Sequence, residues 1–178
     1  MARYAALLRA VNVGGRKLQM TALRELMVAH GFADATTYIQ SGNVVFSAGA
    51  TDEAAIARKI ERGIVDELGV TTRVIIRSGT ELAAVLKQHP FAGAGSDPRK
   101  VFVTFLARAP EAGRVAALKV PTGEQVQFVV VGRDVFSYYP DGYGRSKVAL
   151  PFFEKGLDMY GTARGWNTVV KLAELTAS

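Results

Sequence analysis

The sequence predicts an α+β protein built from two units with nearly the same order of elements. The first observation is the order β-α-β-β-α-β, which apolar periodicity and turn residues indicate between residues 4 and 77. The second is the order β-α-β-β-α between residues 101 and 159, without an evident repeat in sequence. The first order is that of the ferredoxin-like arrangement. We therefore expect two ferredoxin-like units, residues 1–78 and 79–178, packed into one compact body.

In the first unit, Tyr4–Val11 is an apolar run of strand length, which favours a central strand. Thr36–Ser47 is rich in β-branched and aromatic residues and predicts a hairpin around Ser41-Gly42-Asn43. Gly42 and Asn43 tolerate the positive φ that such a turn requires. Thr72–Arg77 alternates and predicts a further strand. Apolar positions at helical spacing predict two helices through Leu23, Leu26, Met27, Ile56, Ile60, Ile64 and Leu68.

In the second unit, Thr80 is the expected N-cap of a helix, and residues 91–99 form a loop with glycine and proline. The other expected elements are three strands and three helices. The strands are Val101–Ala107, Gln125–Val131 and Asp134–Tyr139, and the helices are Pro110–Leu118, Leu150–Met159 and Trp166–Leu175.

Composition restricts the classes of function. With 178 residues, of which 49% are hydrophobic and 21% charged, the chain is typical of a globular protein. The absence of cysteine excludes disulfides, thiolate catalysis and cysteine-based zinc sites. His30 and His89 lack metal-ligand spacing with acids, so we expect neither metal nor cofactor. Without a signal peptide or a long apolar run, we expect a cytoplasmic protein with no membrane segment.

The net charge is +6, and two stretches of the chain carry cations without any acid. Residues 1–24 contain five cations, and residues 159–173 contain two; they are Arg3, Arg9, Arg16, Lys17, Arg24, Arg164 and Lys171. Such stretches can form a positive surface for anionic ligands, or they can be solvated faces of a basic protein. The first interpretation predicts that Arg9, Arg16, Lys17, Arg164 and Lys171 share one surface.

The loop after the first strand is a candidate anion site. Its residues Asn12, Gly14, Gly15, Arg16 and Lys17 combine open backbone amides with two cations. It matches neither the P-loop nor the dinucleotide-binding glycine pattern. We expect it to lie beside the hairpin turn at one end of the sheet. A plain surface connection remains the alternative.

Three other stretches could contact a ligand. Tyr38, Ser41 and Asn43 offer hydroxyl and amide groups at the hairpin, although Ser41 and Asn43 could instead satisfy the turn backbone. Pro140–Lys147 is a second glycine-rich basic loop, in which Arg145, Ser146 and Lys147 could hold a phosphate or carboxylate; a plain exposed loop is the alternative. The last stretch is residues 161–171, where the only Trp of the chain could stack on a planar ligand or belong to the core. The candidates there are Arg164, Trp166, Asn167 and Lys171.

The same stretches carry a resemblance to a bacterial family. Residues 4–15, Met20, Gly31-Phe32 and residues 37–44 resemble the domain of unknown function 1697 family, as do Pro90-Phe91 and the closing pattern Thr162-x-Arg164-x-Trp166-Asn167-Thr168-x-x-Lys171-Leu172. The resemblance covers nearly the whole chain and implies an α+β fold of two ferredoxin-like units. It implies no established activity, substrate or catalytic residue. One departure is Gly165, where the family often has Asn.

Three functions remain open from the sequence. The first is binding of an anionic, phosphate-bearing ligand such as a nucleotide or nucleic acid through the basic loops. The second is an enzyme acting on a phosphorylated or carboxylated small molecule, with Lys17, Ser41 and Arg164 as binding groups. The third is a protein-interaction module that uses an exposed strand edge. The sequence assigns no catalytic residue and no oligomeric state.

Overall fold

The computed structural model describes residues 1–12, 17–49, 52–93 and 95–177. The chain divides into two compact units. Unit 1 comprises Met1–Ala84 together with Leu172–Ser178, and unit 2 comprises Val85–Lys171. Within the described residues each unit holds one four-stranded antiparallel sheet, which confirms the predicted α+β class.

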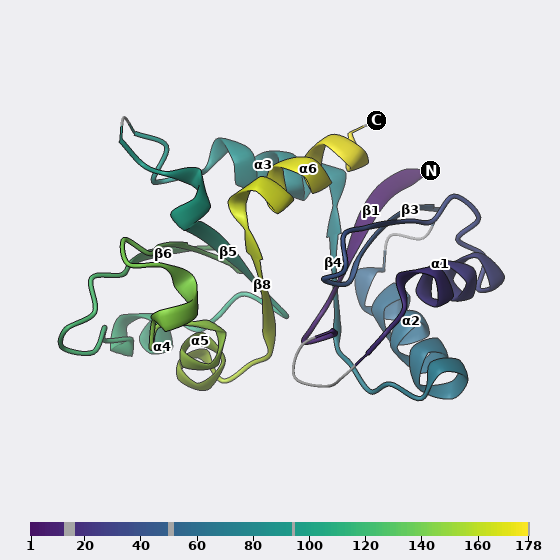
Figure 1. Ribbon diagram of the computed structural model, residues 1–178, viewed down its shortest axis with the longest axis horizontal. Coiled ribbons are helices and arrows are strands. Elements are labelled where there is room, and N and C mark those ends of the chain that lie inside the picture. Colours follow the sequence, from purple (N-terminus) through teal and green to yellow (C-terminus); the bar gives the residue numbers. More distant parts are fainter. Residues whose placement is uncertain (13–16, 50–51, 94, 178) are drawn as a thin grey trace. The chain divides into compact units, whose positions relative to one another are not determined.

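Unit 1 has the strand order β2-β3-β1-β4, so β1 lies in the interior of the sheet as predicted. Helices α1 and α2 are drawn beside this sheet in Figure 1, and their apolar side chains join the same core as the sheet. The elements are β1 Ala2–Leu8, α1 Met20–Ala29, β2 Thr36–Tyr38, β3 Asn43–Ala48, α2 Glu53–Leu68 and β4 Val74–Ser78.

The core of unit 1 follows from the alternation of its strands. Tyr4 lies opposite Phe46, their rings stack 5.9 Å apart, and both join the core that α1 and α2 cover. Ala5 and Leu7 point to the other face of the sheet and are also buried. Burial on both faces explains why β1 is continuously apolar rather than alternating.

The ends of these elements follow local rules. α2 begins where the Asp52 carboxylate accepts a hydrogen bond from Ala55 N at 3.0 Å. It ends at Gly69, whose φ of 67° is the left-handed value usual after a helix. β1 is shorter than the predicted strand because Ala10 and Asn12 have φ of 53° and 58°, which extended backbone does not allow.

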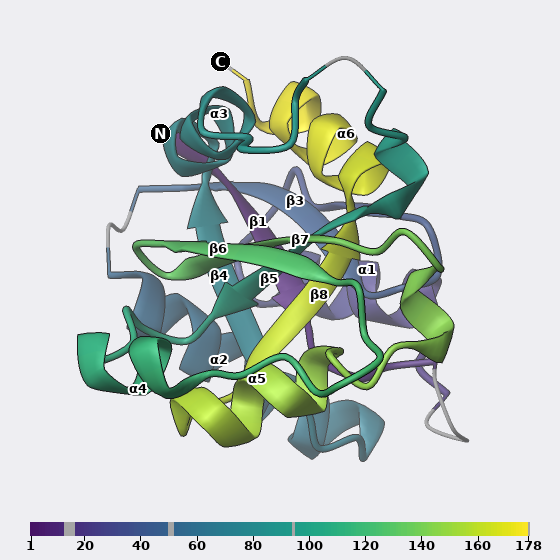
Figure 2. The same ribbon diagram turned by 90° about the vertical axis from the view of Figure 1, so that its left-hand side faces the viewer.

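Unit 2 repeats the topology with the strand order β6-β7-β5-β8. Figure 2 shows this sheet toward the viewer, with α4 and α5 below it. The elements are β5 Val101–Leu106, α4 Ala112–Ala117, β6 Gln127–Val131, β7 Asp134–Tyr138, α5 Leu150–Leu157 and β8 Gly161–Gly165, with short 3-10 turns at Pro98–Lys100 and Tyr143–Arg145. Buried Leu106, Val135 and Phe153 belong to its core.

Strand β8 completes the β-α-β-β-α-β order of unit 2, although its composition predicts no strand. Gly161 and Gly165 are poor strand formers, and Arg164 interrupts the apolar pattern. β8 nevertheless pairs antiparallel with β5 over its whole length, from Gly161 opposite Leu106 to Gly165 opposite Phe102. Backbone pairing with a buried partner strand here outweighs local preference.

Each six-element order is followed by a helix, α3 Gly79–Lys87 after β4 and α6 Trp166–Thr176 after β8. The sequence places the boundary at residues 78 and 79 and leaves the chain end in the second unit. In the structure the start of α3 and the end of α6 both belong to unit 1. The start of α3 and the end of α6 lie close together, since a Cβ at Gly79 would lie 2.4 Å from the Thr176 carbonyl oxygen.

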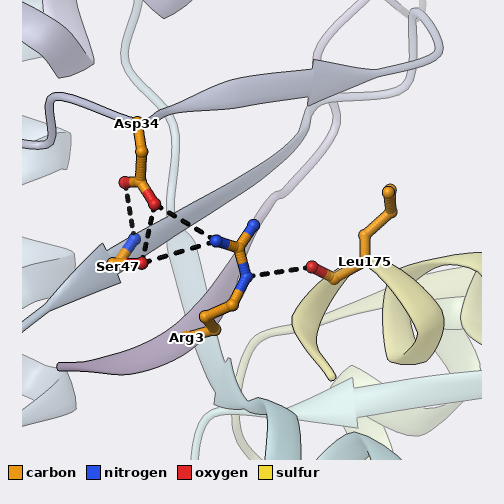
Figure 3. Close-up of polar contacts among 4 residues, drawn as sticks. All are labelled: Arg3, Asp34, Ser47 and Leu175. Atoms are coloured by element: carbon orange, nitrogen blue, oxygen red, sulfur yellow. Dashed lines mark hydrogen bonds and ion pairs between the residues drawn. The ribbon is translucent and has the colours of Figure 1, made fainter. Parts of the chain in front are cut away.

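A polar network around Arg3 also holds the chain end in unit 1 (Figure 3). Arg3 Nε donates to the Leu175 carbonyl at 3.0 Å, and its Nη1 lies 3.2 Å from the Asp34 carboxylate. Asp34 also accepts hydrogen bonds from the hydroxyl of Ser47 at 2.6 Å and from its backbone N–H at 2.8 Å. These bonds from Ser47 lower the pKa of Asp34, with a smaller contribution from the charge of Arg3.

Candidate functional site

The loop after β1 and the hairpin turn lie together in unit 1, as the sequence predicts. Asn12 Nδ2 donates to the Gln40 carbonyl at 2.7 Å. The backbone N–H of Leu8 donates to the Gly42 carbonyl at 2.9 Å. The predicted proximity to the hairpin turn is therefore confirmed for the described end of the loop at Asn12.

The side-chain amide of Asn12 forms its hydrogen bonds with the protein backbone. Its Oδ1 accepts from Leu18 N at 2.7 Å, and its Nδ2 donates to Leu18 O at 3.0 Å, in addition to Gln40. These bonds join the two described ends of the loop. Gly14, Gly15 and Arg16 lie outside the described residues, and Lys17 is exposed. The geometry therefore gives Asn12 a structural role in closing the loop.

Asn43 has a similar structural role in the hairpin. It begins β3, is fully buried, and donates from Nδ2 to the Tyr38 carbonyl and to Ser41 Oγ, both at 3.1 Å. Positive φ occurs at Gly42, as predicted, and at Ile39 rather than Asn43. Ser41 is exposed and Tyr38 is half-buried. The buried amide of Asn43 thus serves the turn.

Arg164 is buried in β8, with an exposed fraction of 7%. It donates to Thr162 Oγ1 at 2.6 Å and to the Ala163 carbonyl at 2.9 Å. Burial lowers the pKa of its guanidinium to about 10. A side chain this buried is poorly placed to meet a ligand from solvent, in contrast to the exposed cation that the sequence suggests.

A second buried arginine occupies the equivalent position of unit 1. Arg77 is the fourth residue of β4, as Arg164 is of β8, and its exposed fraction is 1%. Arg77 Nη1 also donates to the carbonyl of the preceding residue, at 3.1 Å. Arg77 lies opposite Ala5 of β1, and Arg164 lies opposite Val103 of β5. The two units therefore share this arrangement although the sequence shows no clear repeat.

The remaining candidates of the last stretch are at or near the surface. Trp166 is half-buried, and its ring centroid lies 4.1 Å from that of His89. Asn167 and Lys171 are exposed. Trp166 is thus neither a fully buried core residue nor a free platform, because one part of its ring packs on His89.

The proposed common surface of five cations stays a prediction. Arg9 and Lys17 belong to unit 1, whereas Arg164 and Lys171 belong to unit 2. Arg16 lies outside the described residues.

In the loop Pro140–Lys147, a carboxylate already occupies the anion position. Glu124 accepts from Ser146 Oγ at 3.0 Å and from the backbone N–H of Lys147 at 2.7 Å. The acceptor that the sequence leaves to a ligand is here a side chain of unit 2 itself.

Unit 1 contains a cleft of about 570 Å³ that is lined by four arginines. Arg58 and Arg62 lie one turn apart on α2, and Arg9 and Arg73 lie beside the ends of β1 and β4. The backbone fixes this second pair, since Arg9 N donates to the Arg73 carbonyl at 2.9 Å. Thr72 Oγ1 adds a hydrogen bond of 2.7 Å to the Arg9 carbonyl. We call this the arginine cleft.

Glu61 and Asp66 also line the arginine cleft, so arginines exceed acids by four to two. Glu61 accepts from Val74 N at 2.8 Å and lies 3.6 Å from Arg73 Nη1. Across the described ranges, Arg58 and Arg62 have neither an ion pair nor a hydrogen bond from their side chains. The described acids of the cleft therefore balance only part of its positive charge.

Sequence reasoning included Arg9 among its cations but missed Arg58, Arg62 and Arg73 as parts of a site. The helical periodicity leaves Arg58 and Arg62 off the apolar stripe of α2, which is a usable signal for exposure. Their convergence with Arg9 depends on the pairing of β1 with β4, which the local pattern does not contain.

In the part of the chain that the structure describes, no group of three His, Asp or Glu side chains is placed to hold a metal ion. Among the described helices, none is both long enough and apolar enough to cross a membrane.

Comparison with models of protein families identifies a family for this chain. Residues 1–136 match the model of a family described as protein of unknown function (DUF1697). The chain belongs to the DUF1697 family. This membership confirms the resemblance carried by residues 4–15 and 37–44.

A solved structure supports the fold of this DUF1697 protein. The chain is similar to the conserved bacterial protein SP0830 from Streptococcus pneumoniae, with 22% identity and a TM-score of 0.77. The similarity covers 99% of each chain. At this identity the likeness shows the fold alone. The search of curated proteins found no match.

Proposed function

We propose that this DUF1697 protein binds a small phosphate-bearing anion in the arginine cleft of unit 1. The observation that carries the proposal is the convergence of Arg9, Arg58, Arg62 and Arg73 on one concave surface. A guanidinium donates two parallel hydrogen bonds to phosphate oxygens and keeps its charge at all ordinary pH values.

The ligand class follows from the size and charge of the arginine cleft. Its volume of about 570 Å³ lies within the range of small-molecule sites. Four cations against two acids favour a ligand with more than one negative charge, such as a diphosphate. Glu61 contributes by holding Arg73 beside Val74, the first residue of β4, rather than by contacting the anion. Binding of nucleic acid is the alternative that a test should separate from this proposal.

The first experiment measures binding of inorganic pyrophosphate and ADP to the purified full chain by calorimetry. The double variant Arg58→Gln with Arg62→Gln should lower the affinity by about 100-fold or more, because each of the two lost charge-assisted hydrogen bonds contributes about 1.5–3 kcal/mol and about 1.4 kcal/mol is a factor of ten. Arg24→Gln with Arg145→Gln removes the same charge from exposed residues outside the cleft and should have little effect. If both double variants lost the same affinity, the loss would come from the change in net charge and would not support a site in the arginine cleft.

A second part of the experiment tests whether the protein binds nucleic acid instead of a small anion. Oligonucleotide affinity should fall with salt by about 0.7 to 0.9 log units per log unit of salt for each phosphate contact. A strong, salt-sensitive preference for the oligonucleotide over pyrophosphate would contradict the small-ligand proposal. Failure of all three ligands to bind below about 1 mM, a weak affinity on the usual scale, would end the anion-site interpretation.

A further inference from the structure

Unit 2 contains a row of aromatic rings that the arginine cleft does not use. The ring of Trp166 packs on that of His89. The ring centroid of Phe91 lies 6.4 Å from that of His89 and 6.0 Å from that of Tyr138. All four residues are half-buried. Half-exposed rings are the parts from which proteins build stacking surfaces for planar ligands.

The end of this row forms one wall of an open hollow of about 310 Å³. Phe91 and Tyr138 contribute rings, Gln127 contributes an amide, and Gly93, Gly95 and Ser96 contribute a loop. Tyr138 and Gln127 are paired across β7 and β6, so the sheet fixes their separation. The hollow is thus partly built on rigid strands.

The loop side of the hollow is held by its own hydrogen bonds. Ser96 Oγ donates to the Phe91 carbonyl and, at 3.0 Å, to the Gly93 carbonyl. Phe91 N donates to His89 Nδ1 at 3.2 Å, which sets the position of Phe91 relative to the His89 ring. Gly93 and Gly95 have no neighbour within 4 Å of where a Cβ would be, so there is open space beside both residues.

The chemistry of the lining indicates the ligand. None of the described residues around the hollow is charged, in contrast to the arginine cleft. A neutral planar ring could stack on Phe91 or Tyr138. Its N–H and C=O edges could pair with the amide of Gln127, which both donates and accepts hydrogen bonds. Nucleobases combine these two properties.

We propose that this hollow is a binding site for the base of a nucleoside, with Tyr138 and Phe91 as the stacking surface and Gln127 as the hydrogen-bonding group. This site lies in unit 2 and does not depend on the proposed function of the arginine cleft. It recognises the uncharged part of a ligand, so its test needs no phosphate.

The experiment measures binding of adenosine, guanosine, cytidine and uridine to the full chain by equilibrium dialysis, with ribose as the ligand that lacks a ring. Tyr138→Ala should weaken nucleoside binding by about tenfold or more, in line with the loss of one base–aromatic stack. Tyr138→Phe retains the ring and should bind like the wild type. Gln127→Ala should weaken binding and change the order of preference among the four bases.

Two further variants make the result decisive. Tyr38→Ala removes a half-buried tyrosine from an edge strand of unit 1 and should leave nucleoside binding unchanged. Arg58→Gln with Arg62→Gln should also leave it unchanged, which separates this site from the arginine cleft. If Tyr138→Ala fails to fold, Gln127→Ala still tests the site. Nucleosides that bind no better than ribose, or binding that persists in both Gln127→Ala and Tyr138→Ala, would overturn the proposal.

Discussion

At the scale of single residues, Gly42 shows how a turn is tied to the strand beside it. Its φ of 77° is left-handed, which most residues avoid. A Cβ at this position would lie 2.5 Å from Val11 Cγ2 and 2.9 Å from Leu8 Cβ. Both atoms belong to buried side chains, so neither can move away easily. Glycine is therefore required twice, by conformation and by space.

Gly42→Ala should lower the free energy of unfolding by about 2–5 kcal/mol, the sum of left-handed strain and overpacking. Gly165→Ala is the matched control, since its φ is not positive and the nearest atom to a Cβ, on Phe102, is 3.8 Å away. This substitution should change stability by no more than about 1 kcal/mol. Denaturant unfolding of both variants is the measurement, and equal losses would contradict the steric argument.

At the scale of elements, α3 begins and ends with well-defined polar contacts. Ser78 and Glu81 form a capping box, in which Glu81 N donates to Ser78 Oγ at 3.2 Å and Ser78 N donates to Glu81 Oε2 at 2.9 Å. The cap is therefore Ser78 rather than the predicted Thr80. Beyond the end of α3, His89 accepts from Phe91 N through Nδ1 and packs on Trp166. The turn after α3 thus depends on a neutral imidazole.

This arrangement makes stability depend on pH. Burial lowers the pKa of His89 below its ordinary value, so the unfolded chain binds the proton first as the pH falls. The stabilisation by neutral His89 is complete above about pH 6.5, the pKa of histidine in the unfolded chain, and it is lost as the pH falls below that value. The stability difference between the wild type and His89→Gln should therefore shrink on acidification. Thermal unfolding followed by the fluorescence of Trp166 measures it, and a difference that is constant or grows would contradict this prediction.

At the scale of the whole molecule, the chain leaves unit 1 after Ala84 and returns to it at Leu172. The returning segment contains buried Leu172 and Thr176, and its Leu175 carbonyl accepts the hydrogen bond from Arg3. Both ends of the chain therefore contribute to the stability of unit 1.

Leu172→Ala should lower the free energy of unfolding by about 2–5 kcal/mol, the usual cost of a cavity left by a buried leucine. Asn167→Ala, at an exposed position of the same helix, should change stability little. Hydrogen exchange should become faster in β1 and β4 of unit 1 in the Leu172 variant. Unchanged protection of these strands would show that the returning segment does not stabilise unit 1.

Much of the fold is encoded in local patterns, and the candidate site is not. Apolar periodicity of 3.6 identifies α1 and α2 through Leu23, Leu26, Ile56 and Ile60, and the β-rich hairpin identifies β2 and β3. Proximity of the loop after β1 to the hairpin turn follows from strand order alone. Each of these predictions uses spacing along the chain, which neighbouring residues determine.

Only tertiary structure decided which polar residues are buried and which converge. Arg164 and Arg77 look like ordinary surface cations in sequence, yet both are buried. Asn12 and Asn43 look like ligand contacts, yet their amides satisfy backbone groups. The arginine cleft joins Arg9 to Arg58, which lie far apart along the chain. Burial and convergence arise from long-range contacts, and a local pattern records the period of an element but not its neighbours.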